Sequence, residues 1–323
     1  MRARRGIHKI TRHSKGLIVV MLTRERELTD KITDLKTQRK AIILAHNYQI
    51  GEVQEIADVV GDSLELSRQA AETDAKVIVF CGVRFMAETA KILSPEKTVL
   101  LPDPQAGCPM ADMISAQQLR DFKARYPGLP VVAYANTSAE VKAESDICCT
   151  SANAVKIVES LKADTVLFVP DKSLGAYIAS KTSKRIVSYS GYCPTHHRIL
   201  AQDVVAAKHD HPQALVVAHP ECTMDVLALA DAVESTSGML RFVRQSSAKE
   251  FIICTERGLL YGLHKQAPDK LLYNPSPVNV CPNMKKITLE KVLWSLEDMQ
   301  HEIRLAPDVI ERARRALEAM IAA

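Results

Sequence analysis

The sequence lacks several patterns that would place it quickly in a common class of protein. It has no apolar run near the roughly 20 residues that span a bilayer, which argues against a transmembrane helix. It contains no Gly-x-Gly-x-x-Gly or Walker pattern, so the usual nucleotide-binding loops are excluded. The absence of a Cys-x-x-Cys pair excludes a zinc ribbon and a thioredoxin motif. Aromatic residues are only 5% of the 323 residues, and the composition is otherwise that of an ordinary globular protein.

The excess of positive charge is confined to the start of the chain. The formal net charge is +4, and residues 1–20 hold 6 basic side chains and no acidic one. The rest is nearly neutral, which excludes the basic stripe of a nucleic-acid-binding protein. The apolar stretch after this start is short for a signal peptide and lacks a small-residue cleavage site. We expect residues 1–21 to be a basic leader, disordered or an over-extended start, on a cytoplasmic protein whose 8 cysteines are reduced.

A pattern of polar residues repeats along the chain at intervals of 85 to 88 residues. Each copy begins with an apolar run that ends in a polar cluster, at His46, Tyr134 and His219. A hydroxyl side chain follows 17 residues later in each copy, at Ser63, Ser151 and Thr236. A Cys-Pro pair completes each copy, at Cys108, Cys193 and Cys281. The constant spacing predicts three copies of one structural unit.

Each copy also alternates between two kinds of local pattern. Short β-branched runs are followed by helical stretches such as residues 52–60 and 153–161, which predicts an α/β fold of parallel strands joined by crossover helices. The expected segments are the leader at 1–21, unit one at 22–126, unit two at 127–212, unit three at 213–287, and C-terminal helices at 288–323 that pack on unit one.

The repeated polar residues are expected at one end of the three units. Parallel sheets bind ligands beyond the carboxyl ends of their strands, and the repeated positions follow the strands. If a pseudo-threefold axis relates the units, the nine positions converge on one site. The alternative is that each unit merely needs the same turn, but cysteine is not a turn residue.

The three repeated cysteines suggest a metal site, because cysteine-rich sites favour zinc or an iron–sulfur cluster. A full [4Fe–4S] cluster takes four cysteines, so Cys108, Cys193 and Cys281 would leave one iron open. An open metal position can act as a Lewis acid on a substrate. His196 and His197 lie near Cys193, where they could support the metal ligands or be exposed loop residues.

Other repeated side chains suit an anionic substrate and proton transfer. The three hydroxyls stand near expected helix starts, where they would bind an anion or simply cap the helix. Tyr48, Asn136 and Glu221 are equivalent in the repeat, and tyrosine and glutamate are credible proton donors and acceptors. His46 and His219 could add contacts to the same anion.

Taken together, these motifs resemble the quinolinate synthase family of bacterial NAD biosynthesis. The segments that carry the resemblance are His46-Asn47-Tyr48, Gly61-Asp62-Ser63, Cys108-Pro109-Met110, Cys149-Thr150-Ser151, His219-Pro220-Glu221-Cys222 and Asn283-Met284-Lys285-Lys286. The resemblance covers about residues 36–323 and leaves the leader outside. It implies three αβα sandwich domains with parallel sheets around a pseudo-threefold axis.

The resemblance also implies a reaction and a site. The implied enzyme is a transferase that condenses iminoaspartate with dihydroxyacetone phosphate to quinolinate, with release of phosphate and water. One [4Fe–4S] cluster with an open iron would be held by Cys108, Cys193 and Cys281. The implied substrate-binding residues are His46, Ser63, Tyr134, Ala135, Asn136, Ser151, His219, Pro220, Glu221 and Thr236. The implied catalytic residues are Tyr48, Glu221 and His46. Functional coupling to L-aspartate oxidase or aspartate dehydrogenase is expected, and neither a nucleic acid nor a membrane is expected as a partner.

The residues alone leave two other classes of protein open. The cysteine trio could hold zinc in a hydrolase, or the chain could be an iron–sulfur sensor without turnover. Several convergent groups capable of proton transfer argue against a pure sensor, as does the lack of DNA-binding features.

Overall fold

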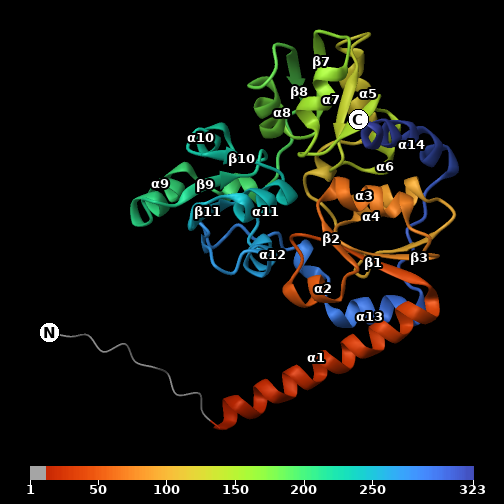
Figure 1. The fold of residues 1–323 in the computed structure, drawn as a ribbon. Coiled ribbons are helices and arrows are strands. Elements are labelled where there is room, and N and C mark those ends of the chain that lie inside the picture. Colours follow the sequence, from red (N-terminus) through yellow and green to blue (C-terminus); the bar gives the residue numbers. More distant parts are fainter. Residues whose placement is uncertain (1–11) are drawn as a thin grey trace.

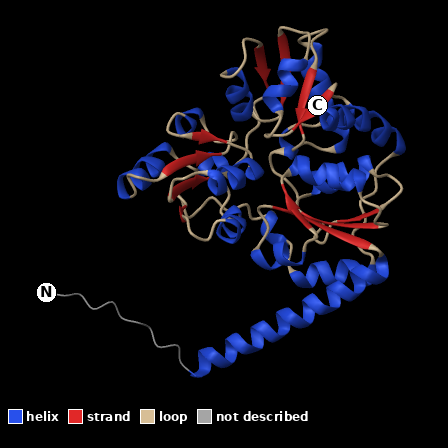
Figure 2. Ribbon diagram, viewed as in Figure 1, coloured by secondary structure: helices blue, strands red, loops and turns tan. Residues whose placement is uncertain are grey.

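The computed structural model describes residues 12–323, with side chains from Thr23 onward. In this part of the chain, the strands form three parallel sheets of four strands each. Figure 1 shows the sheets as three lobes around a common centre, and Figure 2 shows each sheet flanked by helices. The α/β class with three repeated units is therefore confirmed. The expectation for the leader falls largely outside the structure, because residues 1–11 lie outside the described residues.

The three sheets have the same strand order. Unit one contains β1 (Ala41–His46), β2 (Val59–Gly61), β3 (Val77–Cys81) and β4 (Thr98–Leu100). Unit two contains β5 (Val131–Tyr134), β6 (Ile147–Cys149), β7 (Thr165–Val169) and β8 (Arg185–Ser188). Unit three contains β9 (Leu215–Ala218), β10 (Ala232–Val233), β11 (Glu250–Cys254) and β12 (Leu271–Tyr273). In each sheet the order is second, first, third and fourth strand, so the period in the sequence is a repeat of structure.

Helices connect the strands and cover the sheets. Unit one has α2 (Gly51–Ile56), α3 (Ser63–Glu72), α4 (Arg84–Leu93) and α5 (Ala116–Ala124). Unit two has α6 (Ala139–Ala143), α7 (Ala154–Ser160), α8 (Lys172–Ala179) and α9 (Ala201–Asp210), the last of which packs on β11 of unit three. Unit three has α10 (Met224–Leu227), α11 (Thr236–Gln245) and α12 (Leu259–Gln266). Because helices lie against the sheets, a central strand such as β3 is buried along its whole length and its sequence is continuously apolar.

Three further helices lie outside the units: α1 (Arg12–Arg39), α13 (Leu289–Asp298) and α14 (Pro307–Ala322). Helix α13 packs on α1 and β3. Helix α14 packs on α6 and β6 of unit two and on α4 of unit one, so it joins two units (Figure 1). Among the described residues, none of the helices combines the length and the apolar character needed to cross a membrane.

The expected helix at residues 52–60 is wrong at its end. Helix α2 stops at Ile56, and the short strand β2 follows at Val59–Gly61. The Asp58 carboxylate accepts a hydrogen bond of 2.8 Å from the backbone N–H of Ile43 in β1, which fixes the start of β2 beside β1. The same bond occurs in the other units, between Asp146 and Val131 at 2.7 Å and between Asp231 and Val216 at 2.8 Å.

A short 3-10 turn follows each repeated cysteine. These turns are η1 (Ala111–Met113), η2 (His196–Arg198) and η3 (Met284–Lys286). Each turn begins three residues after its cysteine, so the three Cys-Pro loops have the same local shape.

Candidate active site

The carboxyl ends of the three sheets surround one cavity. His46 ends β1, Tyr134 ends β5 and His219 directly follows β9, and all three side chains line the cavity. The other repeated positions line the same cavity, namely Ser63, Ser151, Thr236, Cys108, Cys193 and Cys281. Tyr48, Asn136 and Glu221 line it too. The convergence inferred from the repeat is therefore present in the structure.

Two of the expected substrate-binding residues lie elsewhere among the described residues. Ala135 is buried next to Tyr134 and does not line the cavity. Pro220 lines a neighbouring groove between units two and three, together with Ser151 and Arg241. Ser151 lines both, so the groove and the cavity adjoin at this residue.

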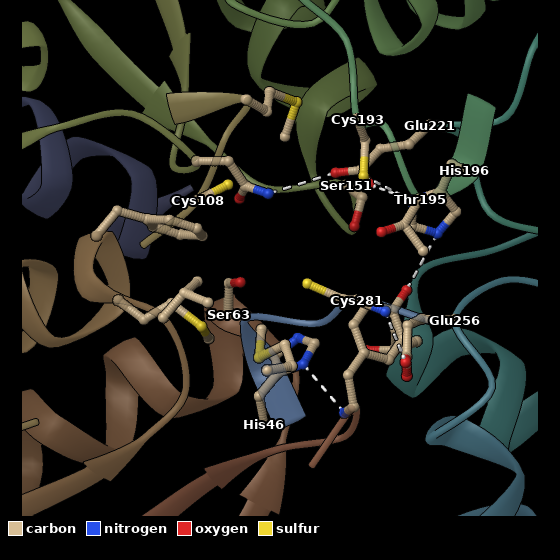
Figure 3. A pocket seen from close by; sticks show the side chains of 18 of the residues that line it. His46, Ser63, Cys108, Ser151, Cys193, Thr195, His196, Glu221, Glu256 and Cys281 are labelled. Carbon is tan, nitrogen blue, oxygen red and sulfur yellow. Dashed lines mark hydrogen bonds and ion pairs between the residues drawn. The ribbon is translucent and has the colours of Figure 1, made fainter. Parts of the chain in front are cut away.

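The three repeated thiols are the cysteines of the cavity. The sulfur atoms of Cys108, Cys193 and Cys281 point into the same space (Figure 3), whereas the other five cysteines are buried away from it. Burial raises the pKa of Cys108 to about 12, although hydrogen bonds from the backbone N–H groups of Ala111 and Met110 act against this rise. Burial also raises the pKa values of Cys193 and Cys281, and backbone N–H groups of the following turn again act in the opposite direction. Such N–H groups favour a thiolate, the form of cysteine that binds metals.

A mixed group of ligands lies beside Cys193. The ligand atoms of Cys193, His196 and Glu221 lie within 4.8 Å of one another, close enough to hold a metal ion. However, His196 Nδ1 and the Glu221 carboxylate are only 2.7 Å apart, so these two side chains already satisfy each other. The three thiols offer a second set of candidate donors in the same cavity.

Glu221 is the centre of a buried polar network. Its carboxylate accepts hydrogen bonds from the Tyr134 hydroxyl at 2.6 Å and from the Asn136 amide at 3.4 Å. Burial raises the pKa of Glu221, but the nearby imidazoles of His196 and His219 and the Tyr134 hydroxyl lower it below its ordinary value. Glu221 is therefore an ionised carboxylate.

Tyr48 has the opposite electrostatic character. Burial, and then the charge of Glu221, raise the pKa of Tyr48 well above its ordinary value. The phenol is therefore protonated. Its oxygen lies 2.5 Å from the Thr255 hydroxyl and 3.3 Å from His196 Nε2, and the Thr255 hydroxyl lies 2.9 Å from the same nitrogen.

The two strand-end histidines are neutral and oriented in the same way. Burial lowers the pKa of both His46 and His219 to about 3. In each, Nδ1 accepts the backbone N–H two residues later, from Tyr48 at 3.2 Å and from Glu221 at 3.3 Å. This acceptor role places the proton of a neutral ring on Nε2, where it can be donated to a ligand.

The helix-capping interpretation of the repeated hydroxyls is wrong for Ser63 and Thr236. Ser63 is the first residue of α3, and the side chain that caps this helix belongs to Asp62. Thr236 is the first residue of α11, which is capped by Ser235. The Thr236 hydroxyl instead accepts a hydrogen bond of 2.9 Å from Asn47. Both hydroxyls face the cavity at the positive end of a helix, an arrangement that suits an anion.

Sequence reasoning missed some residues at this site. Thr255 and Glu256 directly follow β11, and Glu256 lines the cavity. Lys285 pairs with Glu256 at 3.1 Å. Of the two histidines that were expected near Cys193, His196 is buried and contacts Glu221 and Cys193, whereas His197 does not line the cavity and contacts Ser173 at 2.8 Å. One signal was available, because Glu256 stands 20 residues after Thr236, as Asp171 does after Ser151.

The chain is similar to known proteins over most of its length. A family model described as Quinolinate synthetase A protein matches residues 30–322. The quinolinate synthase of Dehalococcoides mccartyi is 60% identical over 294 residues, which cover 91% of this chain and 97% of that protein. Quinolinate synthase 1 of Methanosarcina acetivorans is 55% identical over 92% of this chain and 98% of its own. The quinolinate synthase of Thermodesulfovibrio yellowstonii is 55% identical over 90% of this chain and 97% of its own.

Proposed function

Because the chain belongs to the quinolinate synthetase A family, whose members are enzymes of NAD biosynthesis, we propose that it condenses iminoaspartate with dihydroxyacetone phosphate to quinolinate. Phosphate and water are released. The observation that carries the proposal is the convergence of three thiols, an ionised Glu221 and a protonated Tyr48 on one cavity. Iminoaspartate would come from L-aspartate oxidase or aspartate dehydrogenase, and the reaction would take place in the cytoplasm.

The cofactor of this proposal is one [4Fe–4S] cluster held by Cys108, Cys193 and Cys281. Two observations support the fit: the three sulfur atoms face one space, and backbone N–H groups of the following turns interact with them, which offsets part of the rise in pKa that burial causes. When bound, the cluster supplies an open iron that acts as a Lewis acid toward a substrate hydroxyl or carboxylate.

The side chains around the thiols suit a small substrate with several anionic groups. His46 and His219 offer neutral Nε2–H donors, which can bind a carboxylate without requiring a low pH. Ser63 and Thr236 add hydroxyls at helix N-termini, and Ser151 adds a third from unit two. These donors, one or two from each unit, would hold the carboxylates of iminoaspartate and of the product.

Glu221 and Tyr48 would perform the proton transfers of isomerisation and dehydration. Glu221 is ionised and can remove a proton from substrate carbon or nitrogen, whereas Tyr48 keeps its proton and can donate it to a departing oxygen. The two groups have opposite roles because burial raises both pKa values, but the neighbouring imidazoles and the Tyr134 hydroxyl lower that of Glu221 below its ordinary value, whereas the charge of Glu221 raises that of Tyr48 further.

Anaerobic purification tests the proposal. The iron and sulfide content and the absorbance spectrum are measured, and iminoaspartate and dihydroxyacetone phosphate are then added. We expect about four irons per chain, as for one [4Fe–4S] cluster, together with formation of quinolinate. A colourless, zinc-loaded protein without quinolinate formation would contradict the proposal and favour a zinc hydrolase. An iron–sulfur protein without turnover would favour a sensor.

A further inference from the structure

A buried ion pair lies behind the Cys281 loop. Glu256 follows β11, has no exposed surface and lines the cavity. One of its carboxylate oxygens accepts the backbone N–H of Cys281 at 3.0 Å, and the other accepts the backbone N–H of Gly258 at 2.6 Å. The Lys285 ammonium lies 3.1 Å from both oxygens. The carboxylate therefore connects a thiol-bearing loop to a lysine four residues further along the chain.

The same lysine reaches into another unit. Its ammonium donates a hydrogen bond to the backbone carbonyl of Tyr48, which belongs to unit one. Gly258 permits this approach, because a Cβ atom there would lie 2.5 Å from the Tyr48 carbonyl oxygen and 2.5 Å from the Lys285 ammonium. A continuous path of polar contacts therefore runs from the backbone of Cys281, through Glu256 and Lys285, to the backbone of Tyr48.

The energetics favour one fixed arrangement of these groups. A buried carboxylate loses its hydration and is stable only when its oxygens receive enough hydrogen bonds. Here two backbone N–H groups and an ammonium supply them. A shift of either loop would break at least one of these bonds and leave a buried charge incompletely paired. The Cys281 loop and the Tyr48 backbone are consequently held together.

We propose that Glu256 and Lys285 are positioning residues that set the Cys281 thiol and the Tyr48 phenol in one arrangement across the junction of units one and three. The catalytic role of this Glu256–Lys285 clamp rests on the proposed function, whereas the clamp itself consists of contacts among the chain's own residues. It would make the ligand geometry of one thiol and the position of the candidate acid depend on each other.

The clamp is peculiar to unit three. The position 20 residues after the repeated hydroxyl is Glu256 in unit three, Asp171 in unit two and Val83 in unit one. Asp171 caps α8 by accepting the backbone N–H groups of Ser173 and Leu174 and also interacts with the backbone N–H of Cys193, whereas Val83 has no carboxylate. Contact of the carboxylate with the backbone of the repeated cysteine is therefore shared with unit two, and what distinguishes Glu256 among these three positions is its pairing with Lys285, which reaches the Tyr48 carbonyl.

Thiol labelling of the metal-free full chain tests the clamp without any assumption about the reaction. The variants are Glu256→Gln, Lys285→Met and the double variant, and alkylation of each cysteine is followed by mass spectrometry. We expect Glu256→Gln to raise the labelling rate of Cys281 roughly tenfold relative to that of Cys193, as for loss of a buried hydrogen bond. Equal Cys281 rates in wild type and in either single variant that remains folded would overturn the proposal.

The matched control is Glu55→Gln. Glu55 in unit one pairs with Lys265 of unit three at 2.7 Å, so it also joins these units, but it lies on the exposed outer surface. We expect this variant to label like wild type. A control that labels as fast as Glu256→Gln would show that any loosening of the junction suffices, and would also overturn the proposal. If Glu256→Gln does not fold, the labelling rate of Cys281 in Lys285→Met decides the test. Lys285 is partly exposed in the folded chain, whereas Glu256 is fully buried.

Anaerobically reconstituted protein supplies the second readout. We expect Glu256→Gln to retain less than about half of the wild-type iron, and its turnover per bound cluster to fall roughly tenfold with little change in KM. The double variant should lose less than the product of the two single losses, because the partners act as a pair. Wild-type protein that binds no iron and forms no quinolinate would refute the proposed function, but the labelling result would still decide on the clamp.

Discussion

Tyr48 and Glu221 contact opposite nitrogens of one imidazole: the Tyr48 hydroxyl lies 3.3 Å from His196 Nε2, and the Glu221 carboxylate lies 2.7 Å from His196 Nδ1. The two groups come from units one and three, and the imidazole comes from unit two. The proposed proton donor and proton acceptor are therefore held at a fixed separation by a residue that belongs to neither of their units.

Replacement of a single thiol tests the cluster ligands. We expect Cys281→Ala to lose both iron and activity, because the two remaining thiols are too few to retain a [4Fe–4S] cluster. Iron content and quinolinate formation are measured on anaerobic protein. Cys254→Ala is the matched control, since Cys254 is buried in β11 and does not line the cavity. Full turnover in Cys281→Ala would remove this residue from the ligand set.

The phenol of Tyr48 can be removed without changing the shape of the ring. We expect Tyr48→Phe to keep its iron but to turn over about 100-fold more slowly, as for the loss of a positioned proton-transfer group. Tyr261→Phe is the control, because the exposed Tyr261 hydroxyl donates to Glu55 on the outer surface. Near-normal turnover in Tyr48→Phe would exclude Tyr48 from the chemistry.

Thr255 tests whether the position of the Tyr48 phenol matters. Its hydroxyl lies 2.5 Å from the phenol oxygen and is buried. Thr255→Val keeps the side-chain shape without the hydroxyl, and we expect about a tenfold loss of turnover from one missing buried hydrogen bond. Thr255→Ser should restore most of the turnover. Equal rates for the valine and serine variants would contradict a role for the hydroxyl.

The buried neutral histidines make folding sensitive to acid. The pKa of His46 is about 3 in the folded chain, compared with about 6.5 in an unfolded chain. The unfolded chain therefore binds more protons between these values, and stability falls as pH is lowered through this window. For each such histidine, the slope is about 1.4 kcal/mol per pH unit.

Denaturant titrations of the metal-free chain between about pH 5.5 and about pH 4 measure this slope, well inside the window between the two pKa values. We expect His46→Asn to have a shallower dependence of unfolding free energy on pH than wild type. His209→Asn is the control, because its side chain is 89% exposed. Identical slopes for wild type and His46→Asn would show that His46 is not buried as a neutral ring.

The repeat could be found in the sequence because its parts are local. Strands such as β5 and β9 are short β-branched runs, and the polar residue at the end of each strand is fixed by its place in the run. The common cavity then followed from the geometry of parallel sheets. The same reasoning missed β2, β6 and β10, which are only 2 to 3 residues long and carry too little pattern to be distinguished from a helix end.

Other parts of the site have no local signal. Thr255 meets Tyr48 across 207 residues of chain, and Lys285 meets the Tyr48 carbonyl across 237 residues. Nothing in the neighbourhood of either residue in the sequence indicates the contact, because it depends on how two units pack. The aspartates at 58, 146 and 231 did repeat with the period of the units, so their strand-joining role could have been predicted.

The differences among the three units are as important as their likeness. A trimer of identical subunits would present the same side chain three times, and such a rotationally symmetric site could not tell one end of a substrate from the other. Here the equivalent positions carry the phenol of Tyr48, the amide of Asn136 and the carboxylate of Glu221 on one continuous polypeptide. Covalent fusion of the units therefore breaks the symmetry of the cavity, and an asymmetric molecule can be bound in a single orientation.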